Sequence, residues 1–223
     1  MEKDAILRQT ITSLSHDIRT PLTSMDGYLQ LLELEQEPEQ QEKYIEIIKG
    51  RTKILKEILE ELFLYTKLQD QGYQLELQKE NMTQIVFEGV TAFYEEFKQS
   101  KIEPDILFSE EALEVECNKS MMQRIVQNIV KNSIVHGVSL VRISFRKEEG
   151  QAVLRCENDI KEEDSINMEL IFERFYKADV SRSKSSSGLG LAITKELVEK
   201  MNGTIEAEKQ ENMFEIVIKF DLW

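Results

Sequence analysis

The octet Ser15-His16-Asp17-Ile18-Arg19-Thr20-Pro21-Leu22 contains one of only two histidines in this 223-residue sequence. Around it, apolar residues recur at spacings of three and four, with one gap of seven at the proline. This pattern is typical of a heptad seam on an amphipathic helix. The seam residues are Leu7, Ile11, Leu14, Ile18, Met25, Leu29 and Leu32. His16 falls midway between Leu14 and Ile18, so we expect its ring to face solvent.

The residues beside His16 give its ring a chemical context. Thr20 lies one helical turn later and shares its face of the helix. The Asp17 carboxylate can fix the tautomer of a neighbouring imidazole and raise its basicity. His16 is therefore a candidate nucleophile, with Asp17 and Thr20 as candidate catalytic residues. A lone exposed histidine on a helix is more often simply solvated, so the remaining chain must supply further evidence.

Composition excludes some classes of partner. The chain has 42 acidic and 28 basic residues, a formal net charge of −14. This balance argues against nonspecific binding to nucleic acid and against an anionic membrane surface. Cys117 and Cys156 lack metal-ligand spacing, and we expect both to be buried, reduced thiols. No apolar run approaches the roughly 18–20 residues of a membrane span.

Two long helices are expected first, over 4–34 and 39–69, with a polar loop at Pro38 between them. Pro21 should bend the first helix just after the histidine. The apolar face of the second helix is too wide for one partner helix to bury, which predicts that two such hairpins pair as a four-helix bundle. That face consists of Ile45, Ile47, Ile48, Ile54, Leu55, Ile58, Leu59, Leu62 and Tyr65.

The helical pattern stops at Asp70-Gln71-Gly72, which predicts a domain boundary between 1–70 and 71–223. Beyond it, helical and alternating patterns are mixed. We expect helices over 83–100, 119–136 and 189–201, and a loop-like stretch over 159–187. Strands are expected over 75–79, 102–108, 113–117, 138–147, 152–157, 205–209 and 214–222. Mixed helices and mostly antiparallel strands predict a layered α+β domain.

Two stretches of the second domain could bind a nucleotide. Asn128, Asn132 and His136 lie four residues apart on the helix over 119–136, where amides can meet phosphates and Mg²⁺. The stretch Ser187-Gly188-Leu189-Gly190-Leu191 opens a helix, and glycines let backbone amides approach an anion. An ordinary solvated helix face would account for the asparagines alone.

Four segments together resemble the sequence boxes of bacterial sensor histidine kinases. The octet is similar to their phosphoacceptor box, and Asn128 to His136 is similar to their N box. Phe172-Glu173-Arg174-Phe175-Tyr176 resembles the F box of their ATP lid, and 187–191 resembles their second glycine box. The resemblance implies a multidomain protein, in which an α-helical hairpin forms a dimeric four-helix bundle and precedes an α+β two-layer sandwich that binds ATP.

The resemblance also implies an activity. His16 would be phosphorylated from Mg²⁺-ATP, with Asp17 as acid/base partner, and would pass the phosphoryl group to a response-regulator aspartate. Thr20 would orient the water that dephosphorylates the regulator. Asn132 and Asn128 would hold Mg²⁺, and His136 would stack against adenine. The other implied nucleotide contacts are Asn158, Phe175, Tyr176, Arg182, Gly188, Gly190 and Leu191.

The implied setting is a cytoplasmic homodimer, without a nucleic-acid partner. Its full-length form would be anchored in the bacterial membrane through a sensor part absent from this chain.

The sequence departs from the family pattern at several positions. Val135 replaces the usual lysine of the N box. In the first glycine box Asn158 stands for an aspartate, and Ile160 and Glu162 stand for glycines. These changes leave open a signalling scaffold or phosphatase-only regulator with a degenerate ATP site. Another ATPase sharing this ATP fold is a further alternative, against which the phosphoacceptor octet argues.

Overall fold

The computed structural model describes residues 2–70, 72–161, 166–177 and 187–223, without the side chains of 2–11 and 13. The chain divides into two compact units. The first unit comprises Met1–Lys67 and Glu173–Leu189, and the second comprises Leu68–Phe172 and Gly190–Trp223.

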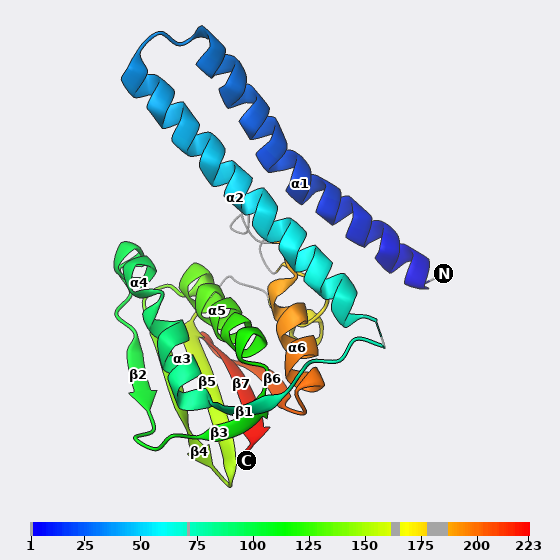
Figure 1. Ribbon diagram of the computed structural model, residues 1–223, viewed down its shortest axis with the longest axis vertical. Helices are drawn as coiled ribbons and strands as arrows, with labels where there is room; N and C mark the ends of the chain where they lie inside the picture. The colour runs from blue at the N-terminus through cyan, green and yellow to red at the C-terminus, as the bar shows by residue number, and fades with distance from the viewer. Residues whose placement is uncertain (1, 71, 162–165, 178–186) are drawn as a thin grey trace. The chain divides into compact units, whose positions relative to one another are not determined.

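The first unit is built on a helical hairpin. Helix α1 (Glu2–Leu34) continues through Pro21, and α2 (Pro38–Leu68) returns beside it (Figure 1). Pro38 occupies the first position of α2, where a missing N–H costs nothing. In the connection, the Glu35 carboxylate accepts hydrogen bonds from the backbone of Gln36 and Glu37. The structure therefore confirms both predicted helices to within two residues at each end.

Many apolar side chains of this hairpin are exposed in the single chain. They include three members of the predicted seams, Leu29, Ile45 and Leu59. Other contacts join the two helices, among them the tilted rings of Tyr28 and Tyr44, whose centroids lie 5.6 Å apart. The hairpin thus forms without covering its whole apolar surface.

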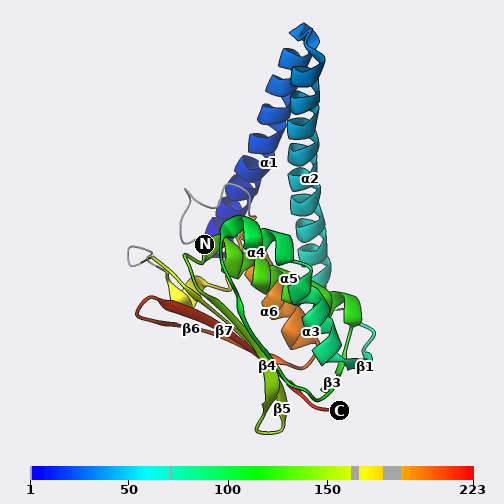
Figure 2. The same ribbon diagram turned by 90° about the vertical axis from the view of Figure 1, so that its left-hand side faces the viewer.

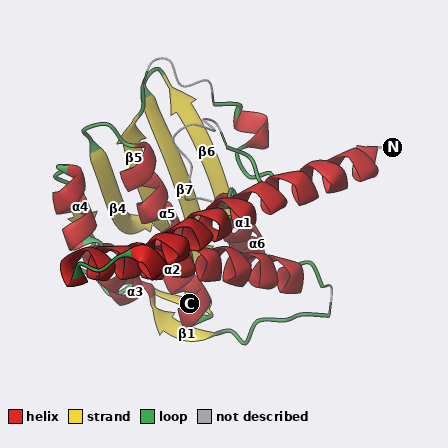
Figure 3. Cartoon of the chain, turned by 90° about the horizontal axis from the view of Figure 1, so that it is seen from above, coloured by secondary structure: helices red, strands yellow, loops and turns green. Residues whose placement is uncertain are grey.

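The second unit contains a five-stranded sheet in the order β2-β4-β5-β7-β6, of which Figure 1 labels all five strands and Figure 3 shows β4, β5, β7 and β6 side by side. Its strands are β2 (Asp105–Phe108), β4 (Val141–Glu148), β5 (Gln151–Asp159), β6 (Thr204–Gln210) and β7 (Met213–Asp221). The β2–β4 pair is parallel and the other pairs are antiparallel. A separate antiparallel pair joins β1 (Gln78–Asn81) to β3 (Glu114–Cys117).

Helices cover one face of the main sheet. They are α3 (Met82–Thr91), α4 (Tyr94–Ser100), α5 (Lys119–His136) and α6 (Gly190–Lys200), which lie together on one side of the sheet (Figure 2). Helix α5 packs between α3 and α6 (Figure 1). A short 3₁₀ turn, η1, spans Met168–Leu170. Fully buried side chains between the layers include Met82, Ile129, Phe145, Leu197 and Ile218. The predicted two-layer α+β sandwich is confirmed.

Four predicted elements differ from the structure. The strands expected from residues 75 and 102 begin only at Gln78 and Asp105, three residues later in each case. The single helix expected over 83–100 is divided into α3 and α4. At the division the Thr91 hydroxyl donates to the carbonyls of Phe87 and Glu88, a side-chain competition that bends helices. The strand expected from residue 138 begins only at Val141, because the Asp159 carboxylate takes the preceding N–H groups.

Candidate functional site

The predicted phosphoacceptor lies in the middle of α1. The His16 side chain is 75% exposed, as its position between seam residues predicts, and its Nδ1 lies 3.7 Å from Oδ1 of Asp17. The Thr20 hydroxyl donates to the His16 carbonyl oxygen at 3.0 Å. The structure therefore brings the three predicted catalytic residues together, with the imidazole accessible to a reagent in solution.

Asp17 has a second partner that sequence reasoning missed. Lys177 Nζ lies 3.0 Å from Oδ1 and 2.9 Å from Oδ2 of Asp17. The two side chains are only 14% and 13% exposed. Lys177 directly follows the segment that resembles the F box, but a lysine in a charged loop carries no sequence signal of this contact.

Further contacts hold both ends of the 173–189 segment within the first unit. The Arg174 guanidinium lies 5.4 Å from the centroid of the Tyr65 ring, and the Ser187 hydroxyl donates to the Glu61 carboxylate. The Phe175 N–H donates to the Gly188 carbonyl at 2.9 Å. Gly188 has φ of +70°, and a Cβ there would lie 2.8 Å from the Phe175 Cα, so this turn requires glycine. Tyr176 is half-buried in the same segment, and the predicted Arg182 lies outside the described residues.

In the second unit, the predicted N box joins the start of α6. Asn128 Nδ2 donates to the Gly190 carbonyl at 3.1 Å and lies 3.3 Å from the Thr194 hydroxyl. This contact links two helices and leaves Asn128 Oδ1 as a possible ligand. Asn132 and His136 follow on α5 at one-turn spacings, and both are half-buried. Leu191 is half-buried in the first turn of α6.

Asn158, near the end of β5, has an unsatisfied acceptor. The residue is 1% exposed, and its Nδ2 donates to the Asp159 carbonyl at 3.1 Å. Its Oδ1 is buried without a hydrogen-bond partner among the described residues. Buried polar atoms are nearly always paired, so this oxygen can accept a hydrogen bond from a donor outside the described residues. An exocyclic amino group, such as that of adenine, is such a donor.

Asp159 fixes the backbone next to this oxygen. Its carboxylate accepts hydrogen bonds from the N–H groups of Val138, Ser139 and Leu140 and from the Ser139 hydroxyl. Burial raises the pKa of Asp159, but these hydrogen bonds outweigh it and lower the pKa to about 2. The loop after His136 is thereby tied to the end of β5.

The altered first glycine box is partly built into the core. Ile160 is buried, and its N–H donates to the Asn212 carbonyl at 2.8 Å. Its side chain therefore packs inward at a position where the family has a glycine. Glu162, the other replacement, lies outside the described residues, and Val135 is exposed on α5.

The donor chemistry of these residues fits ATP better than a metal bound by protein alone. The orphaned Asn158 oxygen suits an adenine amino group. Within the described ranges, no three His, Cys, Asp or Glu side chains gather as a metal cluster. A hard cation such as Mg²⁺ accepts amide oxygens and phosphates as ligands, so Asn128 and Asn132 suit a metal that arrives with a nucleotide.

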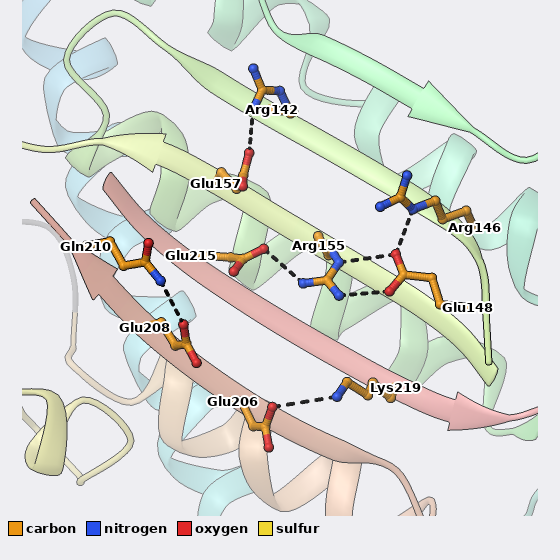
Figure 4. A network of polar contacts seen from close by, with 10 residues as sticks. All are labelled: Arg142, Arg146, Glu148, Arg155, Glu157, Glu206, Glu208, Gln210, Glu215 and Lys219. Atoms are coloured by element: carbon orange, nitrogen blue, oxygen red, sulfur yellow. Dashed lines mark hydrogen bonds and ion pairs between the residues drawn. The ribbon is translucent and has the colours of Figure 1, made fainter. Parts of the chain in front are cut away.

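A second polar cluster lies on the main sheet (Figure 4). Arg155 pairs with Glu148 at 2.8 Å and with Glu215 at 3.2 Å, and Arg142 pairs with Glu157 at 2.8 Å. Arg155 alternates along β5 with Cys156, whose Sγ meets Ser133 of α5, so Arg155 faces away from the helices. Because these arginines are matched by carboxylates, we assign the cluster a role in the sheet and not in chemistry.

The two cysteines are free and buried, as expected. Burial raises the pKa of both thiols to about 12, which makes them poor nucleophiles. Among the described helices, none has the length and apolar character needed to cross a membrane.

Two family models match the chain. Residues 6–71 match the His Kinase A (phospho-acceptor) domain, and residues 117–222 match the histidine kinase-, DNA gyrase B-, and HSP90-like ATPase. The chain is 26% identical over 210 residues to the sensor histidine kinase YcbM of Bacillus subtilis, covering 92% of this chain and 68% of that protein. It spans only 38% to 45% of several further curated relatives.

Solved structures share the fold. The Acinetobacter baumannii histidine kinase AdeS is 21% identical with a TM-score of 0.74, over 93% of this chain and 98% of that one. The histidine kinase ThkA, in complex with the response regulator protein TrrA, is 24% identical with a TM-score of 0.72. That match covers 98% of this chain and 63% of that one.

Proposed function

Because this chain belongs to the histidine kinases of two-component systems, we propose that it transfers the γ-phosphoryl group of ATP to His16 and then to an aspartate of a response regulator. The observation that carries the proposal is the exposed imidazole of His16 with a carboxylate at its Nδ1 side. That carboxylate favours a proton on Nδ1 and leaves the Nε2 lone pair free to attack.

The transfer balances with these groups. A bond forms between His16 Nε2 and the γ-phosphorus as the bond from that phosphorus to the bridging oxygen breaks, and ADP leaves with the electron pair. The ring becomes cationic, and Asp17 stabilises its Nδ1–H. The response-regulator carboxylate then takes the phosphoryl group and restores neutral His16.

We place the nucleotide on the residues that resemble the family boxes. Asn158 would accept from the adenine amino group and His136 would stack on the base. Asn132 and Asn128 would hold Mg²⁺, which neutralises phosphate charge when bound. Gly190 and Leu191 at the start of α6, together with Phe175, Tyr176, Arg182 and Gly188, would complete the contacts.

The finer parts of the proposal concern partners and a reverse reaction. The proposed domains are 1–70 for dimerisation and phosphotransfer and 71–223 for ATP binding.

ThkA forms a complex with a response regulator protein, which supports a regulator as the partner of this chain. The exposed apolar side chains of the hairpin support a homodimer. Thr20, one turn from His16, would orient a water for regulator dephosphorylation. Anchoring of a full-length form in the bacterial membrane is part of the same proposal.

The direct test is incubation with γ-labelled ATP and Mg²⁺, followed by detection of acid-labile label on the protein. We expect label on wild type and none on His16→Gln. His16 is exposed, so the substitution should leave the circular dichroism spectrum and unfolding midpoint unchanged. Label retained by the folded variant would show that another residue is the acceptor.

A further inference from the structure

Lys177 and Asp17 form an ion pair that the proposed reaction does not yet use. Both carboxylate oxygens lie within 3.0 Å of Lys177 Nζ, and both side chains are largely buried. An ion pair on the surface contributes little to the stability of the fold, because solvent screens the charges and the two side chains lose conformational freedom. This pair is shielded from solvent and uses both carboxylate oxygens, so it restrains the orientation of Asp17.

Such a restraint has a geometric purpose. Adjacent residues on a helix do not face each other, so the Asp17 carboxylate has to be turned toward the His16 ring. Asp17 Oδ1 lies 3.7 Å from His16 Nδ1, and the same oxygen accepts from Lys177. In this arrangement His16 is the nucleophile, Asp17 is the base beside it, and Lys177 orients Asp17. The 3.7 Å distance exceeds a hydrogen bond, but such contacts often shorten only in the reacting complex.

The backbone that carries Lys177 is itself held in the first unit. Arg174 lies over the Tyr65 ring. The Phe175 N–H donates a hydrogen bond to the Gly188 carbonyl, and the neighbouring Ser187 hydroxyl donates to Glu61. Two described residues near Lys177 in this segment, Arg174 before it and Ser187 after it, therefore both contact α2.

We propose that Lys177 is a positioning residue for phosphorylation of His16, which acts by holding the Asp17 carboxylate beside His16 Nδ1. The inference rests on the proposed transfer to His16. Lys177 contacts Asp17, so it acts through that carboxylate and is not itself a catalytic residue.

The test compares Lys177→Met with Lys177→Arg in the full chain. We expect Lys177→Met to lower kcat for His16 labelling at least tenfold and to leave KM for Mg²⁺-ATP within twofold of wild type. Arginine keeps the cation, so Lys177→Arg should retain most of the rate. Lys56→Met, which removes an exposed lysine on α2, is the matched control and should leave both constants unchanged.

A double substitution separates this role from general damage. In an Asp17→Asn background, the carboxylate that Lys177 holds is gone, so Lys177→Met should cost no further rate. The proposal is overturned if Lys177→Met leaves kcat unchanged or raises it. It is also overturned if KM rises alone, which would place Lys177 on the nucleotide, or if the loss is as large in the Asp17→Asn background.

A nucleotide-free measurement keeps the inference separate from the proposed function. The ¹⁵N chemical shifts of the His16 ring report which nitrogen carries the proton. We expect wild type to favour the Nδ1–H tautomer and Lys177→Met to weaken that preference. If the two proteins differ in tautomer as expected but wild type takes no label, only the proposed function is contradicted. Identical ring shifts in both proteins would contradict the role of Lys177.

Discussion

The helical hairpin and the α/β unit differ in how completely each covers its own apolar surface. On the hairpin, Leu29 and Leu59 are 46% and 49% exposed although both belong to the predicted seams. In the second unit, Ile129, Phe145 and Ile218 are at most 2% exposed between the helices and the sheet. A layered sheet completes its core within one chain, whereas two helices with wide apolar faces need further helices.

The α/β unit is incomplete in a different and smaller way. Its deficiency among the described residues is one buried acceptor, Oδ1 of Asn158. The hairpin leaves apolar side chains exposed, which a second copy of the chain could cover, whereas the sheet unit leaves one buried oxygen without a donor, which a small molecule could supply. The comparison therefore predicts a protein partner for one unit and a ligand for the other.

The largest expected effect concerns the hairpin. Burying a leucine contributes about 1.5–3 kcal/mol, and a two-fold symmetric dimer contains each substitution twice. Leu59→Glu should therefore weaken dimerisation about a hundredfold or more, by the rule that about 1.4 kcal/mol is tenfold. Sedimentation velocity across nanomolar to micromolar concentrations measures the dissociation constant.

The matched control lies in the other unit. Leu107 on β2 is 53% exposed, close to the exposure of Leu59, and Leu107→Glu should leave the dissociation constant unchanged. A wild-type chain that stays a folded monomer at these concentrations would contradict the comparison, as would equal effects of the two substitutions.

An intermediate effect is expected at Asp159. Its pKa is about 2 in the folded chain against an ordinary 3.8, so the ionised form is favoured by folding. The stabilisation is present above pH of about 4 and is lost as pH falls toward 2. Asp159→Ala should lower the free energy of unfolding at pH 7 by about 2 kcal/mol. Loss of the charged hydrogen bonds costs about 1.5–3 kcal/mol each, but the N–H groups that they leave exposed bind water instead, which limits the total loss.

Urea denaturation of wild type and Asp159→Ala at several pH values checks this. The difference in unfolding free energy should shrink between pH 4 and pH 2. Asp105→Ala, which removes an exposed carboxylate paired with Arg142, should cost less than half as much. A constant difference across the whole pH range would show that the ionised carboxylate is not the cause.

Local signals predicted most of the fold, and tertiary contacts explain the errors. The bounds of α5 follow from Asn118, whose side chain caps the N–H of Met121, and from Gly137 at its end. The late start of β4 depends on Asp159, about twenty residues away in sequence, which no local pattern encodes. The exposure of the His16 side chain was predictable, because His16 lies between two seam residues in the sequence. The Lys177 contact was not, because its partner is 160 residues away in sequence.

The smallest expected effect sharpens the account of the missing donor. An aspartate at position 158 would offer adenine a charged acceptor, worth about 1.5–3 kcal/mol against about 0.5–1.5 kcal/mol for the neutral amide. Asn158→Asp should therefore tighten binding of a nonhydrolysable ATP analogue with Mg²⁺ by up to about tenfold. The structure adds an opposing consequence: Asn158 Nδ2 donates to the Asp159 carbonyl, and a carboxylate there would meet that oxygen with no proton to share. The variant should consequently be less stable than wild type without nucleotide, and nucleotide should stabilise it more.

Calorimetric titration measures the affinity, and thermal unfolding with and without analogue measures the stability. Asn158→Ala, which removes the acceptor, should bind more weakly than wild type. Tight wild-type binding unchanged by either substitution would place adenine elsewhere, and no wild-type binding at millimolar analogue would favour a signalling scaffold with a degenerate site.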